Sequence, residues 1–205
     1  MSDLADIGVD VSRETLAKME AFAALLTRWN ARINLVSPST LPDLWTRHIL
    51  DSAQIYAHAP PNAQHWVDLG SGGGLPAIIC AILAQDSAPD LRFTLIESDR
   101  RKCVFLHTAA RELGVPLRIL TERAESALPQ SADIVSARAL APLPQLLPLV
   151  ARHLAPKGTA LLPKGKNHAS ELAAARVDWQ FEESSYPSQT DPSAKLLILK
   201  GIARV

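Results

Sequence analysis

A turn with four glycines follows a short apolar stretch about one third of the way along the chain. The segment Trp66–Pro76 reads W-V-D-L-G-S-G-G-G-L-P, and Val67 and Leu69 alternate with polar positions as at the end of a buried strand. The apolar run from Ala77 to Leu83 then predicts a helix. A strand, a glycine-rich turn and a helix in this order bring backbone N–H groups to the helix start, and glycine lets a ligand approach the backbone closely. We therefore expect a nucleotide-containing cofactor to bind across this turn.

The spacing of the glycines indicates which cofactor this is. The dinucleotide fingerprint G-x-G-x-x-G requires a glycine at the position of Leu75, and this chain has none there. The turn fits D-x-G-x-G-x-G instead, with Asp68, Gly70, Gly72 and Gly74. That pattern resembles the first motif of class I methyltransferases, which bind S-adenosylmethionine.

Polar positions after the next two predicted strands extend this site. Glu97 follows a strand expected over 91–96, where a carboxylate can accept both ribose hydroxyl hydrogens; the alternative is a solvated loop glutamate. Ala124 and Glu125 follow a strand expected over 117–121. They can contact the adenine edge, or belong to a surface turn.

Arg138 comes directly after a strand expected over 133–136. Its guanidinium can neutralise the carboxylate of the methionine part of the cofactor or clamp a phosphate, since it matches both groups geometrically. The structural alternatives are that Arg138 caps a helix or pairs with Asp133.

Three groups of basic residues are candidates for contact with nucleic acid. They are Arg47 with His48, the run Arg100, Arg101 and Lys102, and Lys164 with Lys166. Each can also be a solvated charge. Three cations at the start of a helix oppose its dipole, which favours an external anionic partner for the second group.

The elements that position these residues alternate along the chain. The periodicity predicts helices over 12–29, which Ser12 caps, and over 41–56, followed by a linker at Pro60–Asn62. Strands are expected over 65–69, 91–96, 117–121, 133–136 and 159–162, helices over 75–85, 99–113 and 143–154, and a closing strand pair over 177–183 and 195–203. This order predicts an α/β fold, with a mostly parallel sheet, helices on both faces and an antiparallel addition at one edge. We expect a helical cap over residues 1–60 and a second domain over 61–205.

Composition limits the function further. The formal net charge is zero, which argues against holding nucleic acid by bulk electrostatics and leaves room for a local basic patch. Cys80 and Cys103 form no metal-ligand pattern, and neither do the six histidines, so we expect no metal and a reduced, cytoplasmic setting. No uncharged apolar run approaches the roughly 18 residues of a membrane span.

Five stretches together resemble one family in its motif order. They are W-N-x-x-x-N-L at 29–35, R-H-I-L-D-S at 47–52, D-L-G-S-G-G-G-L-P at 68–76, A-R-A at 137–139 and L-P-K-G at 162–165. The family is that of the bacterial 16S ribosomal RNA guanine-N7 methyltransferases, also called glucose-inhibited division protein B. The resemblance runs from about residue 15 to the end. This chain departs from the family at Gly73, where a proline or alanine is common.

The resemblance implies a Rossmann-like class I methyltransferase with a seven-stranded sheet. It implies methyl transfer from S-adenosylmethionine to N7 of one guanine in the decoding region, on 16S ribosomal RNA or the small ribosomal subunit. The family's cofactor contacts fall on Gly70, Leu75, Ala124, Glu125 and Arg138. Guanine N7 carries a free lone pair, so we expect in-line transfer without a general base and name no catalytic residue.

Two rival functions stay open on the sequence, a nicotinamide-dependent oxidoreductase and a non-catalytic RNA-binding module. We expect a protein that is a monomer and has no membrane partner.

Overall fold

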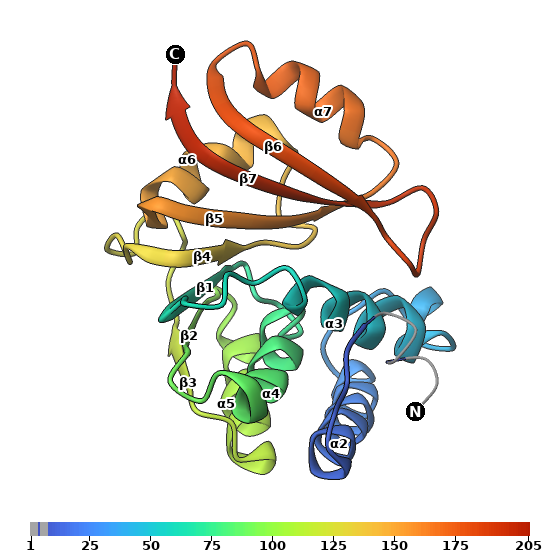
Figure 1. Cartoon of the computed structure of the whole chain (residues 1–205). Coiled ribbons are helices and arrows are strands. Elements are labelled where there is room, and N and C mark those ends of the chain that lie inside the picture. Colours follow the sequence, from blue (N-terminus) through green and yellow to red (C-terminus); the bar gives the residue numbers. More distant parts are fainter. Residues whose placement is uncertain (1–3, 5–7) are drawn as a thin grey trace.

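The computed structural model describes residues 4 and 8–205 (Figure 1). Residues 1–3 and 5–7 of the expected helical cap lie outside the described part of the chain. The first long helix, α2 (Arg13–Asn30), begins where expected, because the Ser12 hydroxyl oxygen accepts from the Thr15 N–H at 3.1 Å. Its buried side chains include Met19, Phe22 and Leu26, which recur at helical spacing.

The segment after α2 differs from the single helix expected over 41–56. It forms a 3₁₀ turn, η1 (Pro38–Thr40), then a π-helical segment, η2 (Trp45–Leu50), which continues into α3 (Asp51–Tyr56). The helix therefore starts at residue 45. A π-helix is rare and often marks a functional site, and this one contains Arg47 and His48.

Seven strands form one sheet, in the order β3-β2-β1-β4-β5-β7-β6. They are β1 (His65–Leu69), β2 (Arg92–Ile96), β3 (Leu117–Leu120), β4 (Ala132–Ser136), β5 (Leu154–Lys164), β6 (Trp179–Pro187) and β7 (Lys195–Arg204). All neighbouring pairs among the first five strands, β1 to β5, are parallel. β7 runs antiparallel to both β5 and β6. This confirms the mostly parallel sheet with an antiparallel addition. The strand order reverses between β1 and β4, where such sheets bind ligands beyond the carboxyl ends of their strands.

The helices that follow the strands are α4 (Ala77–Ser87), α5 (Arg100–Leu113), α6 (Leu143–His153) and α7 (His168–Ala175). Gly114 ends α5 in a left-handed conformation, with φ 62°. α7 is a helix that the sequence did not predict, and β5 begins five residues before the strand expected over 159–162.

Two groups of buried side chains cover the two faces of the sheet. Trp66 and Leu95 belong to one group, with α2, α3, α4 and α5. Val67 and Ile96 belong to the other, with α6 and α7. Since side chains alternate along a strand, the central strands are buried on both faces. Figure 1 shows α2 beside α4 and α5, so the N-terminal segment shares a core with the helices on that face.

Among residues 4 and 8–205, no helix combines the length and the apolar character that crossing a membrane requires.

Candidate functional site

The glycine turn folds back over the end of β1. Gly70, Gly72 and Gly74 have φ values of 64°, 52° and 78°, a left-handed conformation that glycine adopts without steric cost. The Gly70 N–H donates to the Ile96 carbonyl at 2.8 Å, which joins the turn to the end of β2. The alternating glycines are therefore a requirement of the backbone path.

Asp68 lies beneath this turn as a buried carboxyl. The Ser136 hydroxyl donates to its Oδ1 at 2.6 Å, and the Trp66 indole N–H donates to Ser136 at 2.8 Å. Oδ2 has no hydrogen-bond partner among the described residues. Burial raises the pKa of Asp68 to about 7, against the opposing effect of the Ser136 hydrogen bond. A buried oxygen without a partner at this position fits a positively charged ligand.

Glu97 connects the end of β2 to the glycine turn. Its Oε2 accepts from the Gly72 N–H and its Oε1 from the Asp99 N–H, both at 2.8 Å. A carboxylate has about four acceptor sites, so these bonds leave capacity for ribose hydroxyls.

Four of the expected cofactor positions line one cavity of about 260 Å³, here called the glycine-turn cavity. Gly70, Glu97, Ala124 and Glu125 line it, although they follow three different strands. Gly72 and Gly74 shape the turn, and Leu75 is buried behind it at 5 % exposure. These positions meet because the carboxyl ends of parallel strands share one edge of the sheet.

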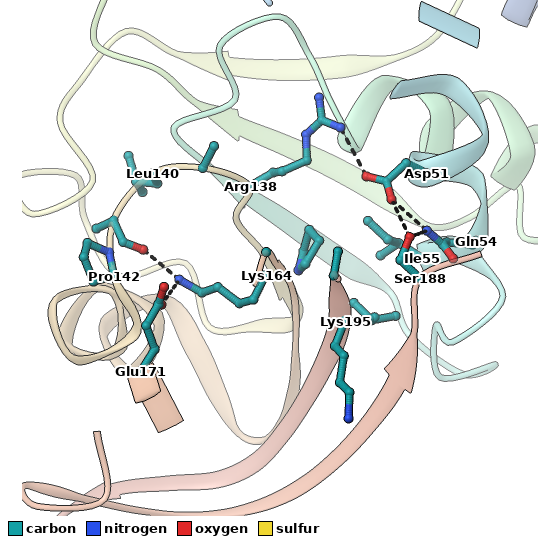
Figure 2. A pocket seen from close by; sticks show the side chains of 16 residues that line it. Asp51, Gln54, Ile55, Arg138, Leu140, Pro142, Lys164, Glu171, Ser188 and Lys195 are labelled. Carbon is teal, nitrogen blue, oxygen red and sulfur yellow. Dashed lines mark hydrogen bonds and ion pairs between the residues drawn. The ribbon is translucent and has the colours of Figure 1, made fainter. Parts of the chain in front are cut away.

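Arg138 lines a second cavity of about 470 Å³, the Arg138 cavity (Figure 2). Its guanidinium lies 3.3 Å from Asp51 Oδ2 and donates to His48 Nδ1 at 2.8 Å. Burial lowers the Arg138 pKa, and the neighbouring Asp51 opposes that effect. The alternative pairing with Asp133 is wrong, because Asp133 accepts from the backbone N–H groups of Gln64 and His65.

His48 has a hydrogen-bond partner on each ring nitrogen. A guanidinium only donates, so Nδ1 is the acceptor toward Arg138 and Nε2 carries the hydrogen. Nε2 lies 2.7 Å from the Thr40 hydroxyl oxygen, and that hydroxyl donates to the Ser37 carbonyl at 2.8 Å. Burial lowers the His48 pKa to about 4, with smaller contributions from Arg138 and Arg47, so the ring is neutral at pH 7. Both nitrogens are therefore engaged within the protein.

Asp51 also lines the Arg138 cavity, although it was not predicted as a site residue. Its Oδ1 accepts from the Gln54 side chain at 2.8 Å and from the Thr190 hydroxyl at 3.0 Å, while Oδ2 faces Arg138. Figure 2 shows Asp51 between Arg138 on one side and Gln54 and Ser188 on the other. Asp51 thus joins α3 to Arg138 and to the loop between β6 and β7. Its place in the R-H-I-L-D-S motif was the available signal.

The remaining basic candidates lie apart from one another. Arg47 pairs with Asp191 at 3.6 Å, and Arg101 with Asp99 at 3.3 Å. Arg100 is exposed, and Lys102 lines the glycine-turn cavity. The Lys164 side chain is only 9 % exposed, pairs with Glu171 at 2.9 Å and donates to the Ala141 carbonyl at 2.7 Å. Lys164 therefore holds the loop after β4 against α7.

The two cavities share Ala139 and Leu140 in the loop after β4. Ala139 has φ 53°, an uncommon value for a residue with a side chain. A Cβ built on Gly70 would lie 2.6 Å from Leu140 Cδ1, so this side chain rests directly on the glycine turn. A ligand in one cavity is thus separated from a ligand in the other by a single loop.

Solved structures support the fold. The chain is similar to the ribosomal protein L11 methylase of Lactobacillus delbrueckii subsp. bulgaricus, with a TM-score of 0.59, 15% identity and coverage of 77% of this chain and 78% of that one. It is also similar to M. jannaschii TYW2 in complex with AdoMet, with a TM-score of 0.56, 12% identity and coverage of 85% and 80%. At these identities the similarity shows the Rossmann-like methyltransferase fold alone.

Sequence relatives are much closer. Ribosomal RNA small subunit methyltransferase G of Cereibacter sphaeroides (strain ATCC 17029) is 52% identical over 197 residues, which cover 96% of both chains. The protein of the same name from Ruegeria sp. (strain TM1040) is 52% identical over 200 residues, covering 98% of this chain and 97% of that one. The profile of the GidB family, rRNA small subunit methyltransferase G, matches residues 15–197. The chain belongs to this family of S-adenosylmethionine-dependent methyltransferases.

Proposed function

We propose that this protein transfers a methyl group from S-adenosylmethionine to N7 of one guanine in the decoding region of 16S ribosomal RNA. The observation that carries the proposal is the pair of cavities on either side of Ala139 and Leu140, within a chain of the rRNA small subunit methyltransferase G family. One cavity suits the methyl donor and the other suits the acceptor base.

The residues of the first cavity fit the donor. In this proposal Glu97 binds the ribose hydroxyls, and Ala124 and Glu125 contact the adenine edge; all three residues line this cavity. Two residues outside this cavity complete the proposed donor site. The unpartnered Oδ2 of the buried Asp68 suits the positive charge of the amino-acid part, and Arg138, which lines the second cavity, suits its carboxylate. When bound, S-adenosylmethionine supplies an activated methyl group on a cationic sulfur.

The acceptor base enters the Arg138 cavity in this proposal. The walls of this cavity come from α3, from the loops after β4 and β5, and from the loop between β6 and β7. N7 of guanine lies in the deep, narrow groove of A-form RNA, so the base leaves the helix or sits in a loop before it is methylated.

The chain's own residues then contribute by orientation and by charge. Guanine N7 carries a free lone pair, so no residue has to remove a proton and no metal ion is required. Holding two reactants in line contributes several kcal/mol to catalysis, about 7–11 in the best-oriented cases. The neutral His48 and the charged Asp51 fix Arg138 between them, which keeps one wall of the acceptor cavity in place.

The same proposal covers the setting of the reaction. The protein acts as a monomer in the cytoplasm, on 16S ribosomal RNA or the small ribosomal subunit, and the helical cap over residues 1–60 is part of the site because His48 and Asp51 lie in it.

The test is to map N7-methylguanine in 16S ribosomal RNA from cells with the gene, without it, and with Gly72→Val. The wild-type gene should give one methylated guanine, and the other two strains none, because a branched side chain at φ 52° distorts the turn. The proposal would be wrong if a nicotinamide dinucleotide alone stabilised the purified protein. It would also be wrong if the guanine were unmethylated in every strain.

A further inference from the structure

A third cavity, of about 450 Å³, lies between α2 and α5, away from the two already described. Six residues line it, namely Arg28, Trp29, Arg32, Ile33, Arg101 and Val104. We call it the Trp29 cavity. Nothing in the proposed cofactor site or acceptor site uses it.

The floor of this cavity is apolar. Trp29 is half-buried, and its ring packs against Phe105 with centroids 5.7 Å apart, which holds the indole in place. Val104 is 55% exposed, so apolar surface lies open to solvent in the same cavity. A rigid aromatic ring beside exposed apolar surface is what an unstacked nucleobase requires, because every base has a π face that can stack.

The rim of the cavity is cationic. Arg28, Arg32 and Arg101 come from two helices and the residues after them, in a chain whose formal net charge is zero. Two acids are close, with Glu112 3.5 Å from Arg28 and Asp99 3.3 Å from Arg101. These are exposed ion pairs, which are weak and screened by salt, so they can yield to a phosphate. Guanidinium groups also bind phosphate through two parallel hydrogen bonds.

Two stretches of chain run from the Trp29 cavity to the proposed cofactor site. Arg101 directly precedes Lys102, which lines the glycine-turn cavity. The segment that follows Ile33 lies over the glycine turn, since a Cβ built on Gly73 would be 3.2 Å from the Leu35 carbonyl oxygen. An RNA strand that presents a guanine in the Arg138 cavity can therefore extend over Leu35 to Trp29.

We infer that the Trp29 cavity binds single-stranded RNA next to the guanine to be methylated, with one base on Trp29 and phosphates on the three arginines. This inference rests on the proposed function, because it takes the RNA substrate from it. It accounts for how a neutral chain binds an RNA, since the positive charge is concentrated where the strand passes.

The first test measures binding of unmethylated 16S ribosomal RNA as a function of salt. The variant carries Arg28→Ala, Arg32→Ala and Arg101→Ala. The control carries Arg13→Ala, Arg92→Ala and Arg118→Ala, the same charge change at the start of α2 and the amino ends of β2 and β3. The slope of log K against log salt is negative, and losing three phosphate contacts should make it less steep by about 2. The control should keep the wild-type slope. Equal slopes for both variants would overturn the inference.

The second test follows the indole directly. Oligouridylate should quench the fluorescence of the wild-type protein more than that of Trp29→Phe, which retains an aromatic ring against Phe105 and so preserves the packing. Equal quenching would show that no base stacks on Trp29.

Methyl transfer separates this inference from the proposed function. If wild-type protein methylates the RNA but the arginine variant keeps the wild-type salt slope, the Trp29 cavity does not bind RNA, and the proposed methyl transfer is unaffected. If wild-type protein binds RNA through the arginines but transfers no methyl group, the proposed methyl transfer is wrong, and the Trp29 cavity is still an RNA-binding site.

Discussion

At the scale of single residues, Asp68 combines burial, a raised pKa and an unused acceptor. Its Oδ1 is bound by Ser136, while Oδ2 has no partner in the described part of the chain. Burying a carboxylate without full compensation disfavours its charged form, which is why its pKa rises to about 7. A cationic ligand reverses this effect, since it binds the ionised form and lowers the pKa. In the proposed cofactor site, ligand binding and ionisation of Asp68 are therefore linked.

This linkage predicts that cofactor affinity depends on pH. Below pH 7 the free protein holds a proton on Asp68 that S-adenosylmethionine must displace, so affinity should rise about fivefold from pH 6 to about pH 7.4. Above about pH 8 it should fall again, because the α-amino group of the ligand then loses its own positive charge. His48, with a pKa of about 4, does not titrate in this window. Titration calorimetry at several pH values measures the effect. Asp68→Asn should bind more weakly and with little pH dependence; a wild-type affinity equal at pH 6 and about pH 7.4 would contradict the linkage.

Some of the site positions could be predicted from the sequence, and some of the contacts between them could not. The positions of Asp68, Gly70 and Glu97 were predictable, because Asp68 lies near the carboxyl end of a strand and the other two directly follow strands whose carboxyl ends must meet at one edge. The contact of Arg138 with His48 and Asp51 was not, because it joins segments 90 and 87 residues apart. No local pattern encodes such a distance, and the simpler partner, Asp133, proved to bind backbone.

At the scale of elements, the π-helical segment η2 accounts for the placement of His48. The segment passes directly into α3, so His48 and Asp51 project from one continuous helical stretch and meet Arg138 together. The wider turn of a π-helix changes which side chains share a face relative to an α-helix. The periodicity of 41–56 predicted a helix but could not predict this change in its turn.

We predict from this placement that His48 positions Arg138 for the cofactor carboxylate. His48→Leu removes the acceptor at Nδ1, so S-adenosylhomocysteine should bind about tenfold more weakly. Methylthioadenosine, which lacks the amino-acid part, should bind with unchanged affinity. His48→Gln should restore much of the loss, because its amide can accept from Arg138 and donate to Thr40. Equal weakening of both ligands would indicate general damage to the fold instead.

Two elements, α7 and the first part of β5, were not predictable from the sequence for physical reasons. α7 has eight residues and only Ala175 among them is buried, so it carries no apolar periodicity. The early part of β5 contains Pro156 and Gly158, which normally interrupt strands, and it pairs with β4 across a register shift. The long, strongly patterned elements α2 and α5 were predicted to within one residue at each end.

At the scale of the whole molecule, the N-terminal segment and the sheet share one core. Met19, Phe22 and Leu26 of α2 are fully buried, and Phe22 lies 6.3 Å from Phe105 of α5, measured between ring centroids. On the same face, Ile49 is also completely buried. Removing these side chains would expose the apolar surface of α4 and α5, and burial of each large apolar side chain contributes about 1.5–3 kcal/mol. The predicted boundary at residue 60 therefore does not separate two hydrophobic cores.

This shared core predicts that residues 61–205 do not fold on their own. The lost burial of Met19, Phe22, Leu26 and Ile49 sums to roughly 6–12 kcal/mol, comparable to the whole stability of a domain of this size. The fragment should show no cooperative thermal unfolding and no stabilisation by S-adenosylhomocysteine. Co-expression with residues 1–60 should restore both, because the missing face of the core is then supplied by a second chain. A fragment that unfolds cooperatively and binds the cofactor alone would show that the N-terminal segment is a separate cap, and His48 and Asp51 would then be auxiliary to a site that is complete without them.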